Sequence, residues 1–137
     1  MKLEHIGIAV KSIEQQLKIW QDLLGFTARM ISEAPEQKVK VAMVDVGGVT
    51  VELLEPLSDD STIHKFIEKR GEGLHHLSFE VEEIEKAIKD LKDKGARMID
   101  ESPRKGAHAA KIAFIHPQST GGVLIELSQR DNKDQEV

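Results

Sequence analysis

Two histidines and two glutamates occupy matching places in the two halves of this 137-residue chain. His5 precedes His76 by 71 positions, and Glu52 precedes Glu126 by 74 positions. Imidazole nitrogens and carboxylate oxygens suit borderline divalent cations such as Zn²⁺, Co²⁺, Ni²⁺, Mn²⁺ and Fe²⁺. Four such ligands around a six-coordinate ion leave positions for water or substrate, as metal-assisted catalysis requires. The spacing therefore predicts one metal site that takes two ligands from each half.

The repeat extends beyond these four residues. Ile13 matches Ile84 at the first offset, and Leu53 matches Leu127 at the second. The pair Gly47-Gly48 likewise matches Gly121-Gly122. The change of offset from 71 to 74 needs only small loop insertions, so the halves are related over most of their length.

Hydrophobic periodicity predicts the elements that must position these ligands. Strands are expected at residues 3–10, 26–31, 39–44, 49–54, 74–81, 96–99, 111–115 and 123–128. Helices are expected between Ser12 and Gly25, before Gly71, and over residues 82–94. Ser12 and Gln15 form a capping box at the start of the first helix. A helix between the first two of four strands, found twice, defines a β-α-β-β-β module.

We therefore predict an α+β fold in which two tandem β-α-β-β-β modules are related by pseudo-two-fold symmetry. Together they would form a curved mixed sheet around the metal site. We expect a single domain over residues 1–137, with module one at 1–56, a connector helix at 57–72, module two at 73–130 and a polar tail at 131–137.

Strand alternation separates the expected ligands from their neighbours. Ile6, Ile8 and Val10 share one face of the first strand, which we interpret as the core face, and His5 lies on the other with Gly7 and Ala9. In the second module, His76, Ser78 and Glu80 share a face. His75 is in phase with the apolar residues, so we interpret it as a core or supporting imidazole. His108 and His116 have no repeat partner and are interpreted as loop residues.

The bulk composition excludes several classes of function. The chain has no cysteine, so disulfides, thiolate ligands and cysteine nucleophiles are excluded. A net charge of −5 with few aromatic residues argues against nucleic-acid binding. No apolar run is long enough to span a membrane, and the N-terminal stretch contains no signal sequence. We therefore expect a cytoplasmic protein.

Several stretches together resemble the methylmalonyl-CoA epimerases of the vicinal oxygen chelate (glyoxalase-like) superfamily, over residues 3–128. They are His5-Ile6-Gly7-Ile8-Ala9-Val10, Pro35-Glu36-Gln37, Val51-Glu52-Leu53-Leu54-Glu55-Pro56, Gly73-Leu74-His75-His76, Phe114-Ile115-His116-Pro117 and Gly122-Val123-Leu124-Ile125-Glu126-Leu127. Their combination is specific, whereas each stretch alone is a weak signal.

The resemblance implies a metal-dependent isomerase that interconverts (2R)- and (2S)-methylmalonyl-CoA. The C2 proton would be removed to give an enolate that the metal chelates. The implied metal ligands are His5, Glu52, His76 and Glu126. The expected ion is Co²⁺, with Mn²⁺, Ni²⁺ or Zn²⁺ as alternatives. The resemblance also implies a homodimer and a CoA thioester substrate, which Gln37 and the basic residues Arg104, Lys105 and Lys111 would contact.

The chain departs from this family at one catalytic position. Some members have a glutamate base where this chain has Val41, and others have Gln where it has Glu52. Epimerisation needs a proton removed from one face and returned to the other. We therefore hypothesise that Glu126 is one acid/base group while it touches the metal. Glu52, or a metal-bound water, would act on the opposite face.

Two other functions remain open at this point. A glyoxalase I-type isomerase could use the same histidine and glutamate set on the same fold. A metal-free small-molecule-binding protein of the drug-sequestering type could share the fold but would not need four ligands at equivalent positions. A dioxygenase is disfavoured, because its iron site typically uses two histidines and one carboxylate.

Overall fold

The repeat predicted from the sequence recurs as a repeat of strand pairing in the computed structural model, which describes residues 1–106 and 109–131. Over these residues β2, β3, β4 and β1 are hydrogen-bonded neighbours in that order, and so are β5, β7 and β6. The pairs β1/β4 and β5/β7 are parallel, whereas β2/β3, β3/β4 and β6/β7 are antiparallel. The mixed sheet with flanking helices confirms the predicted α+β fold.

The elements follow one another along the chain in the predicted order. The strands are β1 (Lys2–Ala9), β2 (Ala28–Ala34), β3 (Val39–Asp45), β4 (Thr50–Pro56), β5 (Gly73–Glu80), β6 (Lys111–Ile115) and β7 (Ile125–Gln129). The α-helices are α1 (Ile13–Leu17), α2 (Thr62–Arg70) and α3 (Ile84–Asp93). The π-helix η1 (Lys18–Leu23) continues α1, and two short 3-10 helices are η2 (Pro35–Gln37) and η3 (Pro117–Ser119).

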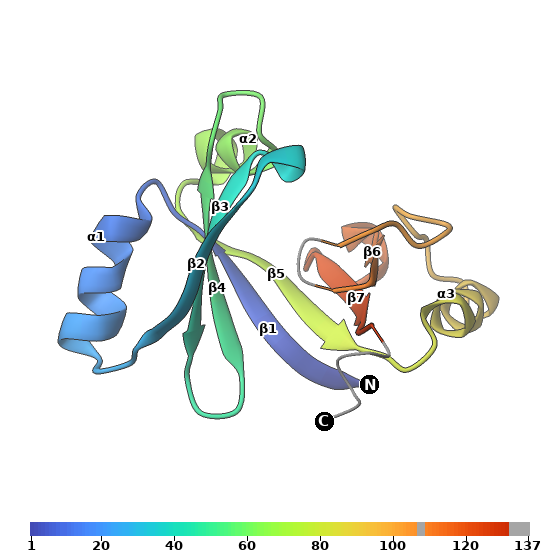
Figure 1. Ribbon diagram of the computed structural model, residues 1–137. Helices are drawn as coiled ribbons and strands as arrows, with labels where there is room; N and C mark the ends of the chain where they lie inside the picture. Colours follow the sequence, from blue (N-terminus) through green and yellow to red (C-terminus); the bar gives the residue numbers. More distant parts are fainter. Residues whose placement is uncertain (107–108, 132–137) are drawn as a thin grey trace. The chain divides into compact units, whose positions relative to one another are not determined.

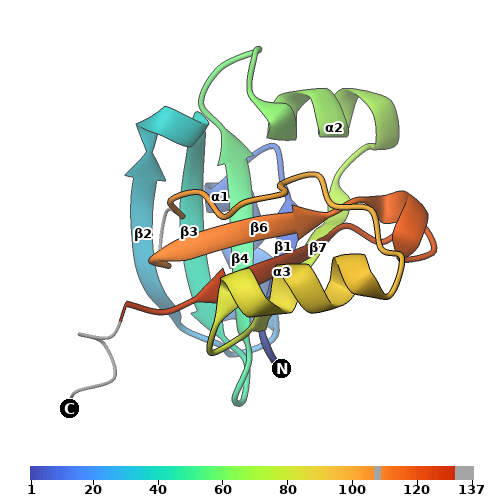
Figure 2. The same ribbon diagram turned by 90° about the vertical axis from the view of Figure 1, so that its right-hand side faces the viewer.

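The chain divides into two compact units. One is His5–His75, and the other joins Met1–Glu4 to His76–Val137. In the first unit, α2 packs beside β4 (Figure 1). In the second, α3 lies along β6 and β7 (Figure 2). No helix among the described residues is both long and apolar enough to cross a membrane.

Equivalent backbone hydrogen bonds join the first strand of each module to its last strand. The N–H of Val10 donates to the carbonyl of Leu54 at 2.9 Å, and the N–H of Val81 donates to the carbonyl of Ser128 at 2.9 Å. Each donor and each acceptor falls on its partner at the repeat offsets found in the sequence. The repeat is therefore a repeat of strand register and not of composition alone.

A second equivalent pair holds the start of each module's helix. The N–H of Ile13 donates to Glu55 Oε1 at 2.7 Å, and the N–H of Ile84 donates to Gln129 Oε1 at 2.8 Å. The first N–H groups of a helix have no partner within the helix, so a side chain from the last strand satisfies one of them. Glu55 and Gln129 were not predicted as helix caps, although they too lie 74 positions apart.

The first helix begins after Ser12 and ends before Gly25 as predicted, but its second half is π-helical. Ser12 Oγ accepts the N–H of Gln15 at 3.2 Å, which confirms the predicted cap. The helix then widens into η1, where the N–H of Leu24 donates to the carbonyl of Ile19, five residues back. Gly25 follows in the left-handed region at φ 82°, which suits a glycine after a helix end.

The expected strand at 96–99 is wrong in extent. Among the described residues it is reduced to a single bridge, in which Met98 pairs with Ile115. Met98 is buried against Ile84 and Ile88 of α3. Two backbone hydrogen bonds flank it, from the N–H of His116 to the Arg97 carbonyl and from the N–H of Ile99 to the Phe114 carbonyl, both at 2.9 Å. Strands β2 and β7 also begin two residues later than predicted, at Ala28 and Ile125.

The sheet in unit His5–His75 is buried on both faces, whereas only the Ile6 face was expected to be core. Val10, Val51 and Leu53 pack on one face with Ile13 of α1. Ala9, Val41, Met43 and Leu54 pack on the other face with Ile63 of α2. The connector helix therefore encloses the face that carries His5, which the strand pattern alone does not reveal.

Candidate metal centre

In unit His5–His75, a histidine and a glutamate meet on neighbouring parallel strands. His5 lies on β1 and Glu52 on β4, and both are buried. His5 Nδ1 lies 2.9 Å from Glu52 Oε2. A buried carboxylate needs a partner to offset its loss of hydration, and the imidazole provides one. The first predicted ligand pair is therefore in contact.

The surroundings of this pair are apolar on one side. Glu52 shares its strand face with Leu54, which belongs to the buried cluster of Ala9, Val41 and Met43. Apolar neighbours lower the local dielectric constant and so strengthen any electrostatic interaction made here. Val41 is only 2% exposed and carries no ionisable group, so module one offers no acid or base at that position.

In the other unit, the second histidine and glutamate lie on β5 and β7. His76 and Glu126 are both buried, and the His76 ring stands edge-on to Phe114 with centroids 6.0 Å apart. Ser78 is paired in register with Glu126. The Ser78 hydroxyl donates to Glu126 Oε1 at 2.7 Å. Module two therefore holds its carboxylate with a hydroxyl group.

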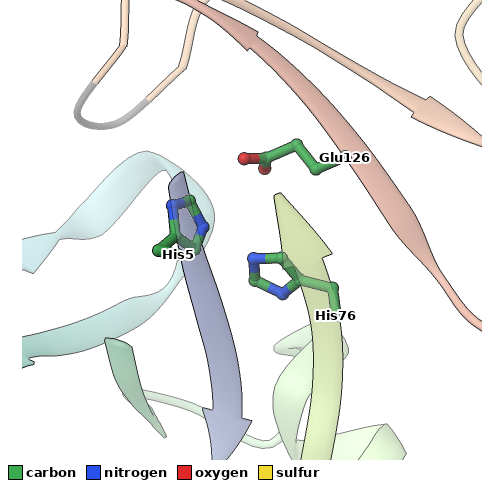
Figure 3. A group of neighbouring side chains, drawn as sticks. All are labelled: His5, His76 and Glu126. Carbon is green, nitrogen blue, oxygen red and sulfur yellow. The ribbon is translucent and has the colours of Figure 1, made fainter. Parts of the chain in front are cut away.

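Figure 3 shows three of the four predicted ligands, His5 from β1, His76 from β5 and Glu126 from β7. Each offers one ligand atom, a ring nitrogen or a carboxylate oxygen, and together they form a possible metal-binding group. Glu52 is not in this group and instead forms a second one with His5 and Glu4. Two imidazoles with a carboxylate fit a borderline divalent ion by donor type and burial. Glu4 was not among the predicted site residues, because alternation assigns it to the opposite face from His5.

His75 lies next to His76 and has a different environment. Its ring packs edge-on against Phe66 of α2, with centroids 4.9 Å apart. Burial lowers the pKa of His75 to about 4, because the protonated imidazole loses hydration there. His75 is therefore neutral near pH 7, in keeping with the supporting role predicted for it.

The predicted substrate-binding residues lie outside these pairs. Gln37 ends η2 and is partly buried. Arg104 is exposed, with its guanidinium 5.4 Å from the Phe114 ring centroid and its Nε 3.3 Å from Asp100 Oδ1. Lys111 pairs with Glu85. Lys105 is exposed. Two of the three predicted basic residues, Arg104 and Lys111, therefore already have acidic partners within the protein.

His116, one of the two histidines expected in loops, has a local structural role. His116 caps η3, where its Nδ1 accepts the N–H of Gln118 at 3.0 Å. This explains His116 without a substrate contact. His108 lies outside the described residues, as does most of the predicted polar tail.

Ser78 and its neighbour Ser128 are further residues near the site that the sequence repeat does not reveal. Alternation had placed Ser78 on the same strand face as His76. The position equivalent to Ser78 in module one is Gly7, so the repeat does not single out Ser78. A residue that acts in only one module is invisible to that criterion.

The family model of the Glyoxalase/Bleomycin resistance protein/Dioxygenase superfamily matches residues 4–114. The uncharacterized protein YqjC of Bacillus subtilis is 44% identical over 93% of this chain and 91% of its own length. The ethylmalonyl-CoA/methylmalonyl-CoA epimerase of Cereibacter sphaeroides is 35% identical over 93% of this chain and 97% of its own length.

Two solved structures are similar over nearly the whole chain. Methylmalonyl-CoA epimerase from Mycobacterium tuberculosis superposes with a TM-score of 0.89 at 32% identity, covering 99% of this chain and 92% of its own. A methylmalonyl-CoA epimerase in complex with methylmalonyl-CoA and ammonium superposes with a TM-score of 0.86 at 32% identity, covering 94% of each chain.

Proposed function

The chain belongs to the methylmalonyl-CoA epimerase family of the Glyoxalase/Bleomycin resistance protein/Dioxygenase superfamily, and we propose that it interconverts (2R)- and (2S)-methylmalonyl-CoA. The observation that carries the proposal is the presence of two buried histidine–glutamate pairs on equivalent strands of the two modules. A chain that served only as a scaffold would have no use for this symmetry of buried polar groups, each of which costs free energy to desolvate.

We propose that His5, Glu52, His76 and Glu126 hold one divalent cation, with Co²⁺ expected and Mn²⁺, Ni²⁺ or Zn²⁺ as alternatives. The two imidazoles and the buried carboxylates fit such an ion by donor type, and two carboxylates offset its charge. When bound, the cation supplies a positive charge that stabilises negative charge developing on the thioester and carboxylate oxygens of the substrate.

Proton transfer is assigned to the two glutamates. A carboxylate removes the C2 proton, and the electron pair of the broken C–H bond moves toward the thioester carbonyl to give an enolate. Return of a proton to the opposite face of C2 completes the inversion. We assign one face to Glu126 and the other to Glu52 or a water that it holds, because Glu52 contacts the His5 imidazole and buried Val41 carries no acid or base.

The remaining assignments are predictions of the same proposal. Gln37, Arg104, Lys105 and Lys111 would contact the CoA carrier, whose phosphates are anionic. Exposed basic groups serve such a contact through long-range attraction that salt screens. A homodimer in the cytoplasm is likewise expected.

The deciding experiment incubates protein loaded with Co²⁺ or Mn²⁺ with (2S)-methylmalonyl-CoA and follows loss of chirality at C2. Epimerisation that stops when a chelator removes the metal, and resumes when the metal returns, is the expected result. No turnover with either ion would reject the proposal.

Two parallel assays separate the alternatives. Conversion of a glutathione thiohemiacetal by the same loaded protein would favour a glyoxalase I-type isomerase. Metal analysis of protein purified without added metal tests the binding-protein alternative, which predicts no stoichiometric divalent ion.

A further inference from the structure

Two buried serines on β5 and β7 form a hydrogen-bonded chain that leads to Glu126. Ser78 is fully buried at 0% exposure, and Ser128 is 5% exposed. The Ser78 hydroxyl oxygen lies 2.7 Å from Glu126 Oε1 and 3.3 Å from the hydroxyl oxygen of Ser128. Ser128 Oγ also lies 3.5 Å from the carbonyl oxygen of Phe79. Three polar side chains therefore form a short chain that ends on a predicted metal ligand.

The number of protons determines the direction of this chain. A serine hydroxyl has a single proton to donate and two lone pairs that can accept. An ionised carboxylate accepts only, so Ser78 donates its proton to Glu126 and can accept one from Ser128. The single proton of Ser128 has two possible acceptors, the Ser78 hydroxyl and the Phe79 carbonyl, so Ser128 supports Ser78 only in part.

Module one has no counterpart of this arrangement. The register of β1 and β4 sets Gly7 opposite Glu52, just as the register of β5 and β7 sets Ser78 opposite Glu126. The repeat equivalent of Ser128 is Leu54, which lies in an apolar cluster. Glu52 contacts the His5 imidazole instead. The two carboxylates thus occupy equivalent positions and are oriented by different groups.

We propose that Ser78 is a positioning residue for Glu126, which it holds in one orientation so that Glu126 binds the metal ion through a single oxygen. The hydroxyl engages Oε1, and the ligand is then Oε2. This inference rests on the proposed function, because it presumes that Glu126 is a metal ligand. Hydrogen-bonding partners of metal ligands typically alter metal affinity by about 10- to 100-fold when removed.

The test measures Co²⁺ binding by Ser78→Ala and Ser128→Ala by competition with a chelator, together with the visible absorption of the bound Co²⁺. Ser78→Ala is expected to weaken Co²⁺ affinity about tenfold or more. The absorption bands should also change, because a carboxylate released from its hydroxyl can bind through both oxygens. Ser128→Ala should shift both readouts in the same direction and less, because it acts through Ser78.

Ser32→Ala is the matched control. Ser32 Oγ is a buried hydroxyl oxygen on β2 with no hydrogen-bond partner among the described residues. Its removal should leave Co²⁺ affinity and absorption unchanged. Thermal unfolding of each metal-free variant shows whether a substitution destabilises the fold in addition to weakening Co²⁺ binding.

The outcomes distinguish the two proposals. If wild-type protein binds Co²⁺ and epimerises its substrate while Ser78→Ala matches it in affinity and absorption, the role of Ser78 is overturned and the function stands. If Ser78→Ala only lowers the unfolding temperature of the metal-free protein, the serine is structural and the inference is also overturned. If wild-type protein binds no Co²⁺, both proposals fail.

Discussion

Glu52 and Glu126 occupy the same place in two copies of one module, yet each is held differently. Glu52 lies 2.9 Å from the imidazole of its own module, and Glu126 accepts a 2.7 Å hydrogen bond from Ser78. The scaffold around them is repeated closely, down to the side chain that caps each helix. The copies therefore share the groups that build the sheet and differ in the groups that orient the carboxylates.

This difference bears on the reaction because an epimerase must act on two faces of one carbon. A symmetric site would have two equal carboxylates. Here one is fixed by a neutral hydroxyl and the other contacts an imidazole beside an apolar cluster. The two carboxylates therefore differ in the groups that orient them, and the predictions below test that difference.

The largest expected effect comes from removing each carboxylate in turn. Glu126→Gln and Glu52→Gln should each lower the rate of epimerisation by about 100-fold or more, the usual scale for loss of an acid/base group. Each variant should still exchange the C2 proton of one epimer in deuterated water, because one carboxylate remains. Metal content is measured alongside, and an amide oxygen at position 52 should retain the ion.

Mass spectrometry of each separate epimer provides the readout of exchange. Full epimerisation by either variant, at wild-type rate and metal content, would remove that glutamate from the mechanism.

The next effect concerns His75, whose repeat equivalent in module one is Glu4. The pKa of His75 is lowered to about 4 in the folded protein, against 6.5 for an ordinary histidine. The unfolded chain therefore binds the proton more readily, so the stability that His75 contributes is complete above pH 6.5 and is lost as the pH falls toward 4. The loss at pH 5 is on the order of 2 kcal/mol in the free energy of unfolding.

His75→Phe should remove most of this acid sensitivity while it keeps an aromatic ring against Phe66. Urea unfolding of metal-free protein at pH 7.5 and pH 5, with a chelator present, measures the difference. An equal loss in wild-type and variant protein would show that burial of His75 does not control acid stability.

A smaller effect is expected where the two helices are capped. Glu55 is charged and Gln129 is neutral, although both accept the first N–H of a helix. A negative charge near a helix N-terminus stabilises it by about 0.3–1 kcal/mol. Glu55→Gln should therefore destabilise the protein by roughly this amount, and Gln129→Glu should stabilise it.

Urea unfolding midpoints at pH 7 give the measurement. The double variant should return close to wild-type stability, because the two sites are independent. A double variant far from that sum would mean that the modules are coupled through their helix ends.

The smallest effect concerns the three basic residues that are predicted to contact CoA, all of which belong to module two. Lys105→Glu should raise the KM for the CoA substrate about two- to threefold at low salt, and the difference should shrink as salt screens the charge. Lys69→Glu, at an exposed position of α2, is the matched charge reversal and should leave KM unchanged. Equal effects of both substitutions would indicate attraction by net charge alone.

Much of the fold was predictable because its signals are local. Alternation in residues 3–10 and 74–81 located two strands, and Ser12, Gly25 and Gly71 bounded helices by backbone preferences that need no distant contact. The segment 96–99 also looked like a strand, but Met98 is held by packing against α3 and makes one bridge. The π-helical turn at Lys18–Leu23 carries no such local signal and was missed.

The sequence by itself determined the repeat, the family resemblance and the four histidine and glutamate positions, because equal spacing on equivalent strands is visible without coordinates. The tertiary structure decided which groups meet them. Register set Ser78 opposite Glu126 and Gly7 opposite Glu52, and α2 enclosed the face that carries His5. Contacts between distant residues depend on strand pairing and packing, and the spacing of residues along one chain does not specify either.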